Sequence, residues 1–192
     1  MNDNQIKLPA KYDAILRASR EINFSMASDL QTGALLRTLV ASKPAGHFLE
    51  LGTGTGLSLA WIVNSMDNQS SVISIDNNPV FYSTAEQFWK DQQRVTLVNT
   101  DAGPWILENQ GLSFDLIFAD SWPGKYQLFE ETWRLLKRGG IYLIDDMLPQ
   151  PNWPSDHPEN VARLIKDLER RDDLQLTKMN WSTGIILVTK TR

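Results

Sequence analysis

Residues 48–56 read FLELGTGTG, an apolar run that leads into glycines at positions 52, 54 and 56 and then into the apolar segment LSLAWIV. This pattern predicts a buried strand, a glycine loop and a helix in direct succession. Glycine lets the backbone turn sharply and approach a ligand closely, and the N-terminus of a helix offers free N–H groups to an anion. We therefore expect a ligand-binding loop at this point of the chain.

The chain around the loop alternates short apolar runs with longer amphipathic stretches, which is typical of parallel strands joined by crossover helices. The strands that we expect are 47–51, 71–76, 95–99, 114–119, 141–144, 174–178 and 184–189. The last two are joined by a short polar turn, so they should pair antiparallel. The helices that we expect between the strands are 57–66, 80–91, 105–109, 127–137 and one around 161–168, with the glycine pair at 139–140 ending the fourth of them.

Two further helices, 11–20 and 29–42, precede the first strand and belong to no strand–helix–strand unit. We expect one domain over residues 1–192, in which residues 1–44 cover the site and residues 45–192 form the core. Residues 147–158 hold four of the nine prolines, together with Trp153 and His157. This stretch is either an extended linker or a lid over the ends of the strands.

Composition narrows the class of protein. The net charge of -4 and the absence of cysteine disfavour a nucleic-acid partner and exclude disulfides, thiolate metal sites and a cysteine nucleophile. The N-terminal residues lack the apolar run of a signal peptide, and no stretch reaches the length of a membrane span. We expect a soluble, cytoplasmic protein without a membrane partner.

Three acidic positions accompany the glycine loop. Glu50 lies just before it, Asp76 ends the second expected strand 24 residues after Gly52, and Asp101 follows the third. Glu50 could instead cap the following helix, Asp76 could form a turn, and Asp101 could be a helix N-cap. The order of these features resembles the class I S-adenosylmethionine-dependent methyltransferases, a Rossmann-like family with a doubly wound, seven-stranded, mostly parallel sheet, an antiparallel last strand and helices on both faces.

That resemblance implies S-adenosylmethionine (SAM) as the cofactor. It assigns Asp76 to the ribose, Asp101 to the adenine, and Glu50 with the loop of Gly52, Thr53, Gly54 and Gly56 to the methionine side. Asn77 and Ala102 are the other cofactor-binding residues that we expect.

Asp120 ends the fourth expected strand and is followed by Trp122 and Tyr126, while Asp145 and Asp146 end the fifth. This part is similar to the catechol and caffeoyl-coenzyme-A O-methyltransferases. The resemblance implies that Asp120, Asp145 and Asp146 are catalytic and that they could hold a divalent cation such as Mg²⁺, which lowers the pKa of the acceptor hydroxyl.

Two positions depart from those relatives. An asparagine is replaced by Asp146, and a lysine is replaced by Pro123, so whether a metal binds stays open. Lys125 and His157 are the candidate bases that remain, and Trp122 and Trp153 either form an aromatic wall for the acceptor or seal the core.

We therefore predict a SAM-dependent methyltransferase that modifies an oxygen of a small molecule. One alternative is a nicotinamide-dependent oxidoreductase, which Leu57 disfavours because a dinucleotide fingerprint has glycine there. The other is a methyltransferase-like binding domain with weakened catalysis. The resemblance also suggests a homodimer, since relatives often pair.

Overall fold

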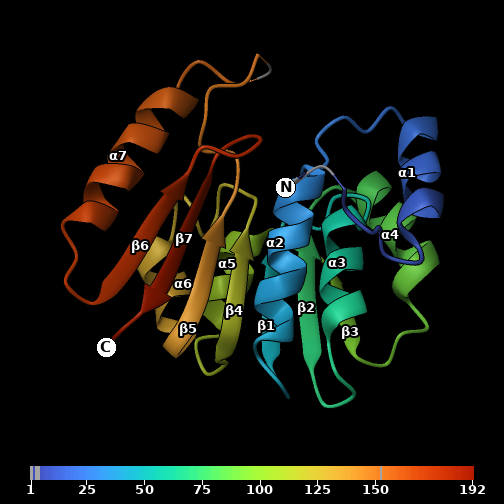
Figure 1. The fold of residues 1–192 in the computed structure, drawn as a ribbon, viewed down its shortest axis with the longest axis horizontal. Helices are drawn as coiled ribbons and strands as arrows, with labels where there is room; N and C mark the ends of the chain where they lie inside the picture. The colour runs from blue at the N-terminus through green and yellow to red at the C-terminus, as the bar shows by residue number, and fades with distance from the viewer. Residues whose placement is uncertain (1, 3–4, 152) are drawn as a thin grey trace.

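The computed structural model describes residue 2, residues 5–151 and residues 153–192. One sheet runs through the molecule in the strand order β3-β2-β1-β4-β5-β7-β6 (Figure 1). Its strands are β1 (His47–Leu51), β2 (Ser71–Asp76), β3 (Val95–Asn99), β4 (Phe114–Ala119), β5 (Leu136–Ile144), β6 (Leu174–Met179) and β7 (Ile185–Lys190). The first five are parallel, and β7 pairs antiparallel with both β5 and β6. The predicted fold class is confirmed.

Seven helices are described on the two faces of the sheet (Figure 1). They are α1 (Tyr12–Glu21), α2 (Leu30–Ala41), α3 (Leu57–Ser65), α4 (Pro79–Trp89), α5 (Ala102–Glu108), α6 (Phe129–Arg134) and α7 (His157–Glu169). Side chains of successive strand residues point to opposite faces. In β1, Phe48 therefore packs with α1–α4, whereas Leu49 and Leu51 pack with α5–α7.

The position of the site follows from the order of the strands. β1 lies between β2 and β4. After β1 the chain crosses over to β2 along one face of the sheet, whereas after β4 it crosses over to β5 along the other face. In an open α/β sheet, a crevice forms at the carboxyl ends of the strands where the order reverses. The glycine loop after β1 and Asp120 after β4 both lie at this point.

The N-terminal helices pack on the α3–α4 face of the sheet. The ring of Tyr12 meets that of Trp61 edge-on, with centroids 5.6 Å apart. α2 lies so close to α3 that a Cβ atom on Gly33 would fall 2.4 Å from the Trp61 indole. The connection between α1 and α2 then reaches the glycine loop, where Phe24 contacts Gly54.

The segment around residue 135 differs from the prediction. The helix expected over 127–137 is only Phe129–Arg134, and β5 begins at Leu136, so Gly139 and Gly140 lie inside a strand and do not end a helix. Leu135 and Leu136 are buried in the core, which favours extended chain there, and the pairing register of β4 with β5 shifts between Phe114 and Leu116. α5 also begins earlier than expected, because Asp101 caps it.

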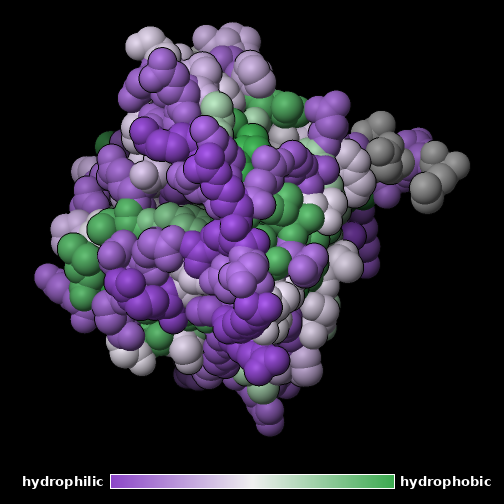
Figure 2. Space-filling model, turned by 90° about the vertical axis from the view of Figure 1, so that its left-hand side faces the viewer, coloured by the Kyte–Doolittle hydropathy of each residue, from purple (hydrophilic) through white to green (hydrophobic). Residues whose placement is uncertain are grey.

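The proline-rich stretch 147–158 is extended chain with turns up to the start of α7 at His157; residue 152 lies outside the described residues. α7 buries Val161, Leu164 and Leu168 against the sheet. The face of the molecule that carries α7 and β6 is mostly hydrophilic, with separate hydrophobic patches (Figure 2). None of the described helices is both long and apolar enough to cross a membrane.

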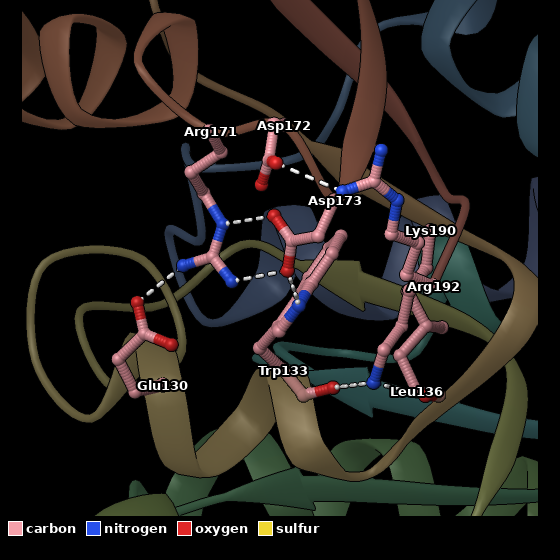
Figure 3. Close-up of polar contacts among 8 residues, drawn as sticks. All are labelled: Glu130, Trp133, Leu136, Arg171, Asp172, Asp173, Lys190 and Arg192. Atoms are coloured by element: carbon pink, nitrogen blue, oxygen red, sulfur yellow. Dashed lines mark hydrogen bonds and ion pairs between the residues drawn. The ribbon is translucent and has the colours of Figure 1, made fainter.

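Polar contacts tie α6 to the start of β6 (Figure 3). Asp173 accepts hydrogen bonds from Arg171 at 2.7 and 2.8 Å and from the indole N–H of Trp133 at 2.8 Å. Lys190 of β7 donates to the backbone carbonyls of Trp133 and Leu136. Through the side chain and the backbone carbonyl of Trp133, the short helix α6 is thereby tied to the antiparallel part of the sheet.

Candidate active site

The glycine loop is held between β2 and β4. The N–H groups of Gly52 and Thr53 both donate to the carbonyl of Ile75, at 2.9 and 3.1 Å. Gly52 has a φ of +102°, and a Cβ atom there would lie 2.6 Å from the carbonyl oxygen of Asp120. Only glycine suits both the backbone angle and the space, so the loop can follow the ends of both neighbouring strands.

Glu50 lies beneath this loop and is fully buried. Its Oε2 accepts a hydrogen bond from Ser74, whose hydroxyl is bonded in turn to that of Thr53, while Oε1 has no partner among the described residues. Burial raises the pKa of Glu50 to about 7. The N-cap of α3 is Gly56, so the interpretation of Glu50 as a helix cap is wrong.

Asp76 joins the glycine loop to the turn after β2. Its Oδ2 accepts from the N–H of Gly54 at 2.7 Å and its Oδ1 from the N–H of Asn78 at 2.8 Å. Each carboxylate oxygen keeps a second lone pair that can accept a ligand hydroxyl. Burial raises the pKa of Asp76. Asp76 therefore forms a turn, as one alternative held, and also keeps acceptors free for a ligand.

Asp101 has a similar double role after β3. Its Oδ1 accepts from the N–H of Gly103 at 2.7 Å, which makes it the N-cap of α5. The side chain is exposed at the mouth of the same cavity as Asp76, next to Ala102.

A cavity of about 400 Å³ opens at the carboxyl ends of β1 to β4. Of the expected cofactor residues, Gly52, Asp76, Asn77, Asp101 and Ala102 line it, whereas Glu50, Thr53, Gly54 and Gly56 are not among the described lining residues. The remaining wall consists of Ile75, Thr100, Ser121, Trp122, Pro123 and Gln127. This volume lies in the usual range for small-molecule sites. Acceptors at Asp76 and Asp101 suit the hydroxyls of a ribose and the amino group of an adenine, so these residues fit SAM.

The three aspartates expected on the acceptor side come together at the ends of β4 and β5. Burial and the negative charge of Asp145 raise the pKa of Asp120 well above its ordinary value. Burial also raises the pKa of Asp145, which is 2% exposed. Asp146 has a φ of +63°, in the left-handed region that aspartate tolerates better than most residues.

Protein groups occupy oxygens of all three carboxylates. Asp145 Oδ1 accepts from the Thr183 hydroxyl at 2.7 Å and from the N–H of Asp146 at 2.8 Å. Asp146 Oδ2 accepts from the Trp153 indole at 3.1 Å, and Asp120 Oδ2 accepts from the Ser28 hydroxyl at 3.3 Å. Within the described part of the chain, no three histidine, cysteine or acidic side chains are placed to hold a metal ion. The aspartates therefore do not fit the divalent cation that the resemblance implied.

The two candidate bases are engaged elsewhere. Lys125 is 3% exposed and donates to the backbone carbonyl of Asp145 at 2.7 Å. His157 is buried, its Nε2 lies 2.9 Å from the Tyr126 hydroxyl, and its ring stacks on Trp153 with centroids 3.9 Å apart. Burial lowers the pKa of His157. Trp122 lines the cavity, whereas Trp153 packs between His157 and Asp146.

Three contacts of the site have no signal in the sequence. Phe24 and Ser28, from the connection between α1 and α2, reach Gly54 and Asp120, and Thr183, from the turn before β7, reaches Asp145. Each partner is distant in the chain, and serine, threonine and phenylalanine at such places follow no periodic pattern. Only the assembled fold shows these contacts.

Comparisons with known proteins identify the family of this chain. The family model described as O-methyltransferase matches residues 15–191. A protein of Mycobacterium sp. (strain KMS), whose name assigns it to the O-methyltransferases, is 31% identical over 140 residues, which cover 69% of this chain and 64% of that protein. The match therefore spans less than two thirds of that relative's length.

Two solved structures share the fold. The O-methyltransferase TomG from Streptomyces achromogenes, in complex with SAM, has a TM-score of 0.85 at 20% identity and covers 98% of this chain and 93% of its own. The O-methyltransferase from Bacillus cereus, in complex with S-adenosylhomocysteine (SAH), has a TM-score of 0.86 at 16% identity and covers 98% and 94%. Taken with the glycine loop, the acidic strand ends and the strand order, the match over residues 15–191 shows that this chain belongs to the O-methyltransferase family.

Proposed function

We propose that this chain transfers a methyl group from SAM to an oxygen atom of a small molecule. The observation that carries the proposal is the cavity of about 400 Å³, which has Asp76 and Asp101 on one side and Ser121 and Trp122, the residues after Asp120, on the other. The cavity thus extends from a nucleoside-binding side to the residues that directly follow Asp120, although Asp120, Asp145 and Asp146 are not among its described lining residues. Family membership favours this activity over that of a nicotinamide-dependent oxidoreductase.

On the cofactor side, SAM supplies an electrophilic methyl group on a positively charged sulfur. Asp76 accepts the ribose hydroxyls with the lone pairs left free by Gly54 and Asn78. Asp101 and Ala102 hold the adenine, with Asn77 beside them. The loop of residues 52–56, supported from below by Glu50, takes the methionine portion, whose carboxylate suits the N-terminus of α3.

On the acceptor side, Asp120 receives the proton of the acceptor hydroxyl as the O–CH₃ bond forms and the S–CH₃ bond breaks. Its raised pKa makes it a stronger base than an ordinary aspartate. Asp145, held by Thr183, keeps the negative charge that raises this pKa. Asp146, held by Trp153, forms the neighbouring wall.

The N-terminal residues 1–44 cover this site in our proposal. Two contacts support the assignment: Phe24 lies against Gly54 of the glycine loop, and Ser28 donates to Asp120. The connection between α1 and α2 thus touches both the cofactor side and the acceptor side.

Calorimetric titration of the purified chain with SAH tests the proposal. We expect micromolar binding that Asp76→Ala weakens at least about tenfold, since a bidentate acceptor of two hydroxyls is lost. Asp172→Ala is the matched control, because the Asp172 side chain is 86% exposed and pairs only with Arg192 at the surface. Binding of NAD⁺ in place of SAH would contradict the proposal. SAH formation with catechol as the probe acceptor would separate a working enzyme from a weakened binding domain.

A further inference from the structure

The segment after β4 forms a tight turn that directs Lys125 into the protein. The carbonyl of Trp122 accepts from the N–H groups of Lys125, Tyr126 and Gln127 at 2.9 to 3.2 Å. Gly124 has a φ of +88°, and its carbonyl accepts from the buried Tyr142 hydroxyl at 2.6 Å. Proline and glycine at positions 123 and 124 favour such a turn. The lysine after the turn is therefore enclosed.

Lys125 is 3% exposed, an uncommon location for an ammonium group. Its Nζ donates to the Asp145 carbonyl at 2.7 Å. Burial lowers the pKa of Lys125, and the negative charges of Asp120, Asp146 and Asp145 oppose this lowering. A buried ammonium is tolerated when opposite charges and hydrogen bonds compensate for lost hydration. The three aspartates provide that compensation.

The compensation is mutual, because the charge of Lys125 opposes the rise in the pKa of both Asp120 and Asp145. One oxygen of each carboxylate already accepts from Ser28, Thr183 or Trp153, and a divalent ion at the other oxygens would be repelled by the buried ammonium of Lys125. The aspartate cluster thus already contains its counter-charge.

We propose that Lys125 is the resident cation of the acceptor end, so that this chain binds no divalent metal at Asp120, Asp145 and Asp146 and transfers the methyl group without one. The claim that methyl transfer needs no metal rests on the proposed function. The claim that no divalent metal binds rests on the contacts of Lys125 and does not depend on that function. Lys125 acts here as a positioning residue, since it is bonded to the backbone carbonyl of Asp145, its charge acts on the three aspartates, and it contacts no reacting atom.

The test is titration of the EDTA-treated chain with MgCl₂ and MnCl₂, with calorimetry and the electron paramagnetic resonance of free Mn²⁺ as readouts. We expect no saturable binding by the wild-type chain at millimolar metal. Lys125→Met should gain Mn²⁺ binding at least about tenfold tighter than that of the wild type, because the aspartates lose their counter-charge. Lys178→Met is the matched control: Lys178 is a half-exposed lysine paired with Glu169 on the surface, so its loss should create no such site.

Submillimolar Mn²⁺ binding by the wild-type chain that is lost in Asp145→Asn would overturn the proposal. So would a folded Lys125→Met variant that gains no binding. If that variant does not fold, the wild-type titration still decides the question. A parallel SAH titration reports on the proposed function by itself, since failure to bind SAH leaves the metal titrations interpretable.

Discussion

The Cα atom of Gly52 faces the carbonyl of Asp120 so closely that a Cβ atom would lie 2.6 Å from that oxygen. Through this contact, the loop after β1 and the loop after β4 fix each other's position. The two loops that carry the proposed cofactor side and the proposed acceptor side therefore share one backbone contact.

Gly52→Ala should damage both the fold and the cofactor site. Alanine would adopt a φ of +102° only with strain and would push against backbone that cannot yield, so we expect a loss of about 2 kcal/mol or more in the free energy of unfolding. Urea denaturation and SAH titration measure the two effects. Gly111→Ala is the control, because a Cβ atom at that position would meet no other atom within 4 Å; equal losses for both variants would contradict the contact.

Glu50 should make stability depend on pH. Its pKa is about 7 in the folded chain against an ordinary 4.5, so between these values the folded state holds a proton that the unfolded state has lost. Stability should fall by about 3 kcal/mol as the pH rises from 4.5 to 7.

Glu50→Gln removes this titration while keeping the shape of the side chain. Relative to wild type, the variant should therefore gain stability as the pH is raised from 5 to 8, which urea denaturation at the two pH values measures. Glu108→Gln, at an exposed position on α5, should show no such change. A Glu50→Gln variant whose stability relative to wild type is the same at both pH values would rule out the raised pKa.

Phe24→Ala should weaken SAH binding while changing stability little. Phe24 is half-buried, touches Gly54 and packs edge-on against Phe81 with centroids 4.9 Å apart. If Phe24 covers the bound SAH as proposed, loss of its ring from the ligand corresponds to about 1 kcal/mol, or roughly a fivefold increase in Kd. Calorimetry measures it, with the exposed Leu107→Ala as the control. Unchanged affinity would mean that the α1–α2 connection does not cover the cofactor.

Asp173→Asn should destabilise the junction of α6 and β6 (Figure 3). Arg171 holds the pKa of Asp173 at about 2, below its ordinary 3.8. The contribution of this carboxylate is thus complete above pH 3.8 and is lost as the pH falls toward 2.

At pH 7 we expect a loss of about 2 kcal/mol from the charge-assisted hydrogen bonds with Arg171. The difference from wild type should shrink below pH 4 in thermal unfolding. Asp172→Asn, which affects only a surface pair, should stay within about 0.5 kcal/mol of wild type at pH 7.

Local patterns predicted most of the fold. The apolar runs located all seven strands, and Gly52, Asp76 and Asp101, three of the expected cofactor residues, line one cavity in the structure. The prediction was wrong around Leu135 and Leu136. The sequence has helical periodicity there, but both side chains are buried in the core, and β5 begins at Leu136.

The contacts around the three aspartates were harder to predict than the residues that line the cavity. The inward direction of Lys125 depends on a turn whose carbonyl and hydroxyl partners come from Trp122 and Tyr142. The contacts of Ser28 and Thr183 join residues that are far apart in the chain. No spacing in the sequence reports such contacts.

The strand order has a consequence for synthesis on the ribosome. β1 can pair with β2 as soon as residues 71–76 have emerged, but its other edge waits for β4, at residues 114–119. All residues of β1 except His47 are buried in the finished protein. A nascent chain that stalls before β4 therefore presents an open strand edge, the kind of surface through which partly made chains aggregate, and translation through residues 77–113 is the interval in which this chain most needs protection.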